Sequence, residues 1–126
     1  MSLILDAGAL IAYERGNRIV RAFLMNAASS GDSVKTTTPV VAQVWRDGAR
    51  QAHTAKLLRG VEEVELTQRR AREVGRLLRL SGCTDVVDAS IVEIAATGDE
   101  ILTSDPDDIL RIADASGRAL VITPVR

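Results

Sequence analysis

Aspartates fall at the points where apolar segments of this chain begin or end. Asp6 and Asp105 each follow a short apolar run, and Asp85 and Asp88 open a longer apolar segment. In a parallel α/β fold such junctions meet at the carboxyl edge of the sheet, where ligands bind. Carboxylates gathered there repel one another unless a cation lies among them, and hard divalent cations such as Mg²⁺ prefer oxygen ligands. The pattern therefore predicts a metal site assembled from distant parts of the chain.

Helix capping is the simpler interpretation of most of these aspartates taken singly. Asp6 and Asp85 suit the position that precedes a helix. Asp105 is followed by a proline, a common helix start, and Asp108 would then add negative charge to the first helical turn. Asp88 is less easily explained, because it would share a helix face with Asp85 among small and branched apolar residues. Capping leaves the recurrence of acids at three such junctions unexplained, so we prefer the metal site.

Strands and helices alternate along the sequence. Short apolar or β-branched runs predict strands at residues 3–5, 33–37, 61–66, 100–104 and 120–123. Helical spacing, capping residues and glycine stops predict helices at residues 7–14, 18–28, 38–45, 54–59, 68–80, 86–96 and 106–115. We expect the helix that begins at Thr38 to carry Trp45 inward. The alternation indicates a single α/β domain over residues 1–126, with a mainly parallel sheet covered on both faces.

Composition narrows the class of protein. The chain has 126 residues, of which 46% are hydrophobic, enough for one core. We expect no membrane span, because no apolar run approaches the roughly 18–20 residues that a helix needs to cross a bilayer, and no signal peptide, because the start lacks a basic segment. A single cysteine, Cys83, excludes an internal disulfide and suits a cytoplasmic location. A single histidine, His53, without a cysteine cluster excludes a zinc site of the usual kind.

Three blocks of sequence resemble the PIN-domain ribonuclease family when they are taken in order. They read LILDAGALIA at residues 3–12, DASIVEIA at residues 88–95 and LTSDPDDI at residues 102–109. At this length the chain looks most like the VapC toxins of bacterial toxin–antitoxin pairs. The resemblance implies a three-layer α/β/α domain, a Mg²⁺- or Mn²⁺-dependent endoribonuclease activity on RNA, a homodimer, and a small cognate VapB-like antitoxin.

The resemblance also assigns the acidic residues. Asp6, Asp88 and Asp105 match the acids that hold the metal and are therefore the expected catalytic cluster. Asp85 and Asp108 are expected as outer or second-metal carboxylates. Two Mg²⁺ ions about 4 Å apart can position a water nucleophile and neutralise the leaving oxygen of a phosphodiester, without any histidine.

One position departs from the family pattern. In the block TPVVAQVW at residues 38–45, the family usually places a glutamate where this chain has Gln43. An amide oxygen is a weaker ligand for a hard dication than a carboxylate oxygen. Asp47 lies one turn further along the expected helix, so either it substitutes for the glutamate, or metal binding is weaker, or activity is reduced.

An arginine stripe is the remaining charged feature. Fourteen of the sixteen basic residues are arginine, and Arg69, Arg72, Arg76 and Arg79 recur at near-helical spacing. A solvated helix face explains the stripe most simply. Contact with RNA phosphates or with an acidic partner is the functional alternative.

Other classes of protein compete with the nuclease. A phospho-receiver would need paired acids after the first strand, and a haloacid-type phosphatase would need an aspartate where Gly8 stands. The stronger alternative is a PIN fold retained as a binding module, in which Gln43 has weakened or silenced the catalytic site.

Overall fold

A five-stranded parallel sheet forms the centre of the computed structural model, which describes residues 1–125. The strand order is β3-β2-β1-β4-β5, and each of the four strand pairings is parallel. The strands are β1 (Ser2–Leu5), β2 (Ser33–Thr37), β3 (Glu62–Val64), β4 (Glu100–Thr103) and β5 (Val121–Pro124). All four residues of β1 are buried, as expected for the central strand of a sheet that is covered on both faces.

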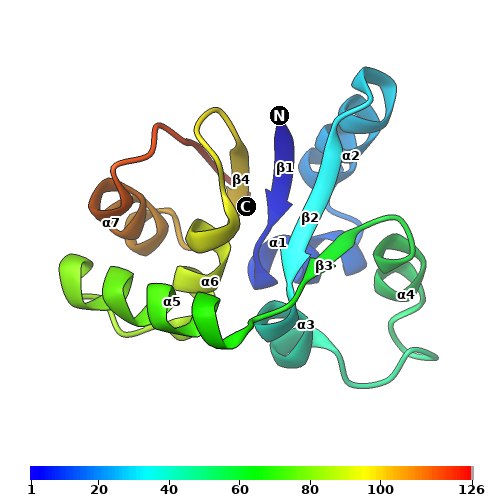
Figure 1. The fold of residues 1–126 in the computed structure, drawn as a ribbon. Coiled ribbons are helices and arrows are strands. Elements are labelled where there is room, and N and C mark those ends of the chain that lie inside the picture. Colours follow the sequence, from blue (N-terminus) through cyan, green and yellow to red (C-terminus); the bar gives the residue numbers. More distant parts are fainter. Residues whose placement is uncertain (126) are drawn as a thin grey trace.

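Helices occupy the connections between successive strands. They are α1 (Ala7–Glu14), α2 (Arg18–Ser30), α3 (Thr38–Val44), α4 (Ala52–Leu58), α5 (Gln68–Ser81), α6 (Val86–Ile94) and α7 (Pro106–Ser116). In Figure 1, α5, α6 and α7 lie together on one side of the sheet, whereas α1, α2 and α4 lie on the other. The molecule is thus a three-layer α/β/α sandwich, and the predicted fold class is confirmed.

The core fills both layers around β1 and β4. Ile4, Leu5, Ile101 and Leu102 are fully buried in these two strands. Such continuous apolar runs are typical of parallel strands, since both faces of each strand are packed under helices. Among the described residues, no helix has the length and apolar character that spanning a membrane requires.

The end of α3 differs from the sequence prediction. The helix stops at Val44, and the backbone at Trp45 turns to an extended conformation. The side chain of Gln51 explains this stop, because its amide nitrogen donates to the carbonyl of Val44 and its amide oxygen accepts from the N–H groups of Arg46 and Asp47. Trp45 was expected to point inward, but it is 38% exposed. It lines a surface groove between α3 and α4 instead.

Candidate metal centre

An acidic cleft opens where β1 and β4 end side by side. These strands are adjacent and parallel. The chain leads from β1 to β2 on one side of this pair, and from β4 to β5 on the other side. Such a switch point leaves a crevice at the carboxyl ends of the strands. The cleft has a volume of about 220 Å³ and is lined by Asp6, Ala7, Gly8, Ile11, Gln43, Asp85, Asp88, Ser104 and Asp105.

Asp6 is the most buried of the aspartates that line this cleft. It is only 3% exposed, and its Oδ1 accepts a hydrogen bond from the N–H of Ala9 at 2.8 Å, which caps α1. Its Oδ2 accepts from the N–H of Ser104 at 3.3 Å, across from the end of β4. Burial raises the pKa of the Asp6 carboxyl, and hydrogen bonds from Thr103, Ala9 and Ser104 act against that rise. One side chain therefore caps a helix and also joins the ends of β1 and β4.

Asp88 has the most strongly shifted pKa among the acids of the cleft. It lies in the first turn of α6 and is 9% exposed, and its Oδ2 is buried without a hydrogen-bond partner among the described residues. Burial raises the pKa of Asp88 to about 7, with smaller contributions from neighbouring carboxylates, of which Asp85 is the largest. A buried acceptor without a donor costs free energy, so this oxygen is suited to a cation that the protein itself does not provide.

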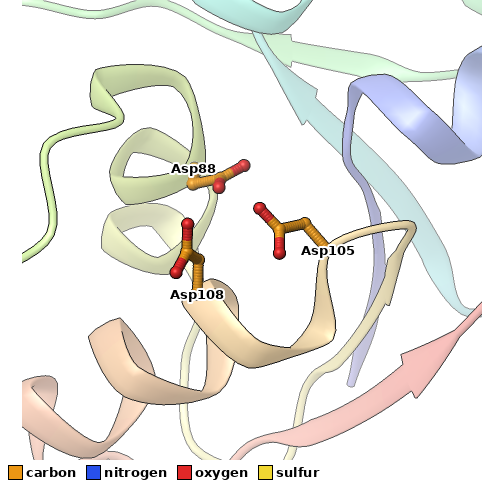
Figure 2. A group of neighbouring side chains, drawn as sticks. All are labelled: Asp88, Asp105 and Asp108. Carbon is orange, nitrogen blue, oxygen red and sulfur yellow. The ribbon is translucent and has the colours of Figure 1, made fainter.

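Asp105 and Asp108 complete an acidic group with Asp88. One carboxylate oxygen from each of the three residues lies within 4.8 Å of the others. Figure 2 shows Asp88 on α6 and the other two at the start of α7, with their carboxylates pointing toward one another. Asp105 precedes α7 without forming a side-chain cap, so its carboxylate is not engaged by the helix that follows it. The capping interpretation therefore does not describe Asp105.

Asp85 sets the position of Asp88. It precedes α6, and its Oδ1 accepts from the N–H of Asp88 at 3.0 Å. Lower on the same helix, the hydroxyl of Ser90 hydrogen-bonds that of Thr37 at 2.8 Å, at the end of β2. The start of α6 is thereby tied to the same edge of the sheet as Asp6 and Asp105. Asp85 acts as a cap and lines the cleft at once.

Gln43 and Asp47 lie in different places. Gln43 lines the cleft together with four of the aspartates. Asp47 follows the end of α3, is exposed, and accepts a hydrogen bond from the N–H of Ala49 at 3.0 Å. Its carboxylate also lies 4.0 Å from the guanidinium of Arg50. The early end of α3 thus separates two residues that a longer helix would have placed on one face.

The arginine stripe lies on the outer face of α5. Arg69, Arg72, Arg76 and Arg79 are all exposed. The guanidinium of Arg76 is paired with Glu73, one turn earlier, at 2.7 Å. Arg72 donates to the carbonyl of Gln68. Of the four, Arg69 and Arg79 have no polar partner among the described residues.

Sequence reasoning missed the residues that hold the acids. The hydroxyl of Thr103 hydrogen-bonds the Asp6 carboxylate and accepts from the N–H of Asp105 at 2.8 Å. It therefore orients two of the acids from one atom. The signal available in the sequence was a threonine at the end of an apolar strand, two residues before an aspartate. Ser104 and Gly8, which face one another in the cleft, gave no comparable signal.

The donor set suits a hard divalent cation. Carboxylate oxygens and one amide oxygen line the cleft, and these are the ligands that Mg²⁺ and Mn²⁺ prefer. The buried Oδ2 of Asp88 adds an acceptor that a cation would satisfy.

Comparison with known proteins bears on the fold. No family model matches the sequence, and no curated protein matches it. Among solved structures, a chain of the VapBC2 complex from Rickettsia felis, crystallised with a DNA fragment from the promoter of the pair, superposes over 100% of both chains with a TM-score of 0.74. This chain has the VapC-type PIN fold. The sequences are 12% identical, so the likeness establishes the fold that the sequence blocks predicted. Within the PIN fold, the acidic cleft of this chain lies at the carboxyl edge of the sheet.

Proposed function

We propose that this protein is a metal-dependent endoribonuclease that acts as the toxin of a toxin–antitoxin pair. The observation that carries the proposal is that aspartates from three separate segments, Asp6, Asp88 and Asp105, line one cleft, in which Oδ2 of Asp88 is buried and has no hydrogen-bond partner among the described residues. Carboxylates assembled in this way destabilise the protein unless they serve a ligand. The PIN fold and the order of the acidic blocks favour phosphodiester hydrolysis over other uses of such a site.

The roles of the residues follow from their surroundings. Asp6, Asp88 and Asp105 are the proposed ligands of Mg²⁺ or Mn²⁺, with Asp108 beside them and Asp85 holding Asp88 in place. A divalent cation in this cleft would supply a bound water as the nucleophile and would neutralise charge on the phosphodiester. The side chains contribute fixed acceptors at the sheet edge, and the exposed Asp105 leaves that edge open to a substrate.

Partners are part of the proposal. The structural relative belongs to a VapBC complex, which supports a small VapB-like antitoxin as the partner of this chain, and the resemblance to VapC toxins supports a homodimer. An enzyme of this kind would act on RNA in the cytoplasm. The exposed arginines of α5 supply positive charge that RNA phosphates would attract, and we propose Arg69 and Arg79 as the contacts that remain available.

A second candidate function rests on Gln43. This residue lines the cleft with an amide where a carboxylate would bind a dication more strongly. A weakened site would leave a PIN fold that binds RNA or a protein partner without cleaving. We favour the enzyme because Asp6, Asp85, Asp88 and Asp105 line one cleft together.

An RNA cleavage assay separates the two candidates. The purified chain is incubated with end-labelled cellular RNA in Mg²⁺, in Mn²⁺ and in EDTA, alongside Asp6→Asn, which removes a charge while keeping the volume. The nuclease predicts cleavage that EDTA and Asp6→Asn both abolish. Cleavage that survives in EDTA contradicts the metal requirement. RNA binding without cleavage under either metal favours the binding module.

The toxin role has its own test. A small open reading frame immediately upstream of the gene would encode the antitoxin. Expression of this chain alone should arrest growth, and co-expression of that small protein should restore it. Growth arrest that Asp6→Asn leaves intact would contradict a nuclease toxin.

A further inference from the structure

Gly8 and Ser104 lie against one another in the acidic cleft. Gly8 lies in the first turn of α1, and both residues line the cleft. A Cβ atom built on Gly8 would overlap the Oγ and Cβ atoms of Ser104 and would come within 3.3 Å of its backbone nitrogen. The serine side chain thus occupies the space that a side chain at position 8 would need.

Backbone conformation does not explain the glycine at this position. The glycines with positive φ are Gly16, Gly31, Gly82, Gly98 and Gly117, and Gly8 is not among them. Its helical conformation would be favoured by alanine, which is the better helix former by up to about 1 kcal/mol. The close approach of Ser104 is therefore the physical reason for glycine here.

The segment that approaches Gly8 also carries a proposed metal ligand. The N–H of Ser104 donates to Oδ2 of Asp6, and the next residue is Asp105, whose own N–H is held by Thr103. Rotation about χ1 could move the Oγ of Ser104 away from a new methyl group. Its Cβ is fixed to the backbone, so the turn that leads to Asp105 would have to move as well.

We infer that Gly8 and Ser104 form a positioning pair, in which the missing side chain at Gly8 lets the Ser104–Asp105 turn close onto Asp6. The inference rests on the proposed function, because it assigns the pair to the spacing of the metal-binding carboxylates. Gly8 and Ser104 act through Asp6 and Asp105 and need not contact the metal or the substrate.

A steric series tests the pair. Gly8→Ala introduces the overlap. Gly8→Ala with Ser104→Ala removes the hydroxyl but keeps the offending Cβ. Gly8→Ala with Ser104→Gly removes both atoms and leaves only the 3.3 Å contact with the backbone nitrogen. Gly75→Ala is the matched control, since Gly75 is also helical and a Cβ there meets nothing within 4 Å.

Two measurements are made on the full chain. One is the backbone amide signal of Asp105 in metal-free protein by ¹H–¹⁵N NMR, and the other is Mn²⁺ affinity by calorimetry without RNA. We expect Gly8→Ala to shift the Asp105 amide and to weaken Mn²⁺ binding by about tenfold or more, the usual effect of disturbing the support of a metal ligand. The alanine–alanine double variant should remain impaired, the alanine–glycine double variant should approach Ser104→Gly alone, and Gly75→Ala should match the parent.

The outcomes distinguish the two proposals. An Asp105 amide that Gly8→Ala leaves in place overturns the positioning pair, whatever the metal affinity. Impairment that Ser104→Gly fails to relieve overturns it too, because a merely destabilised helix would behave in that way. A parent chain that binds no Mn²⁺ overturns the proposed function instead, while the amide signals still report whether the contact places the turn.

Discussion

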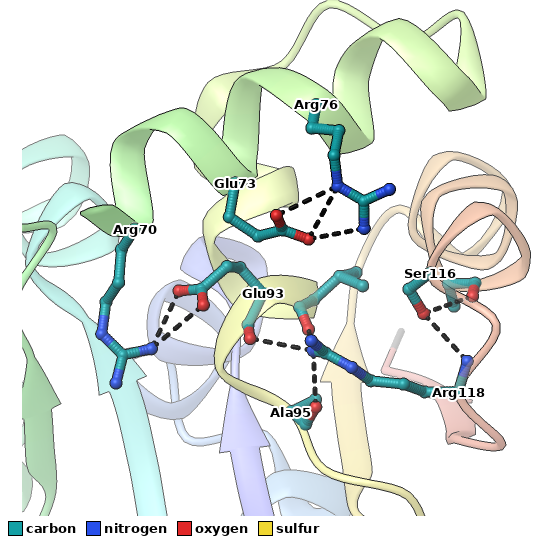
Figure 3. A network of polar contacts seen from close by, with 9 residues as sticks. Arg70, Glu73, Arg76, Glu93, Ala95, Ser116 and Arg118 are labelled. Atoms are coloured by element: carbon teal, nitrogen blue, oxygen red, sulfur yellow. Dashed lines mark hydrogen bonds and ion pairs between the residues drawn. The ribbon is translucent and has the colours of Figure 1, made fainter. Parts of the chain in front are cut away.

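The two ends of α6 treat charge in opposite ways. At its start, Asp88 lies buried beside other carboxylates, and its Oδ2 has no partner in the described part of the chain. At its end, the carboxylate of Glu93 is paired with Arg70 at 3.0 Å, and the guanidinium of Arg118 reaches the carbonyl oxygens of Val92, Glu93 and Ala95 at 2.8–3.0 Å. Figure 3 shows this second group, in which α5 and the segment after α7 both supply cations to the end of α6.

The difference is what a structural role for the end of α6 and the proposed metal site at its start would produce. The end of α6 is met by cations from neighbouring segments, so the carbonyls of Val92, Glu93 and Ala95 and the nearly buried carboxylate of Glu93 all have partners. The same device would have served at the start, yet there the chain provides further acids. The positive end of the helix dipole offsets only part of their repulsion. A site that lowers stability in this way is best explained by a ligand that joins it after folding.

Removing the charge of Asp88 should have the largest effect on activity. Asp88→Asn keeps the volume but removes a proposed metal ligand. We expect RNA cleavage to fall by at least about a hundredfold, since loss of a residue that only orients a metal ligand already lowers activity by up to about that factor. Single-turnover cleavage rates in Mg²⁺ measure the change. Asp114→Asn is the control, an exposed acid of α7 far along the helix from the cleft. Full activity in Asp88→Asn would remove Asp88 from the cluster.

The free energy of unfolding of the metal-free protein should fall as the pH rises, because of Asp88. A salt-bridged acid, whose pKa is lowered by folding, would have the opposite effect. The pKa of Asp88 is raised from 3.8 to about 7, so the folded chain holds a proton that the unfolded chain has lost. The contribution of Asp88 to the free energy of unfolding is therefore fully present below pH 3.8 and declines as pH rises to about 7. Asp88→Asn should remove this decline and, at pH 8, should be more stable than the parent by roughly 2–4 kcal/mol.

Urea unfolding at several pH values in EDTA measures this effect. The parent and Asp88→Asn should have similar stability at pH 4 and should diverge as the pH rises. If the free energies of unfolding of the two proteins differ by the same amount from pH 4 to pH 8, ionisation of Asp88 does not destabilise the fold. The contrast between the two ends of α6 would then lose its energetic basis.

The opposite end of the helix should respond in the opposite sense. Arg118→Gln removes the cation that three carbonyl oxygens share, so we expect the free energy of unfolding to fall by about 1–3 kcal/mol at every pH. Arg111→Gln, at an exposed position of α7, should change it little. Thermal unfolding of both variants provides the comparison. A stabilised Arg118→Gln would contradict the structural role of this end.

The order of elements and the acids of the cleft could be read from the sequence because both follow local rules. Apolar runs and glycine stops placed each strand and helix, and parallel topology brought Asp6 and Asp105 to one edge. Features that depend on distant side chains were beyond those rules. Gln51 ends α3 from seven residues away, and Ser104 approaches Gly8 across the sheet edge. Local pattern also cannot show which carboxylate oxygen lacks a partner.

The smallest and most informative change concerns Gln43. A glutamate at this position would add a negative oxygen to the cleft, so Gln43→Glu should tighten Mn²⁺ binding by a few-fold and raise cleavage at low metal concentration. It should also destabilise the metal-free protein slightly at pH 8, because one more carboxylate would line a cleft that already holds four aspartates. Asp47→Asn is the matched test of compensation. Asp47 is exposed and lies beside Arg50, so its loss should leave metal binding unchanged.

Metal titrations of cleavage for the parent and both variants decide between the alternatives. If Asp47→Asn fails as Asp6→Asn does, the segment after α3 must fold toward the cleft when metal binds. If the parent does not cleave RNA and Gln43→Glu does, the parent is the binding module, and the missing carboxylate at position 43 is what silences its catalytic site.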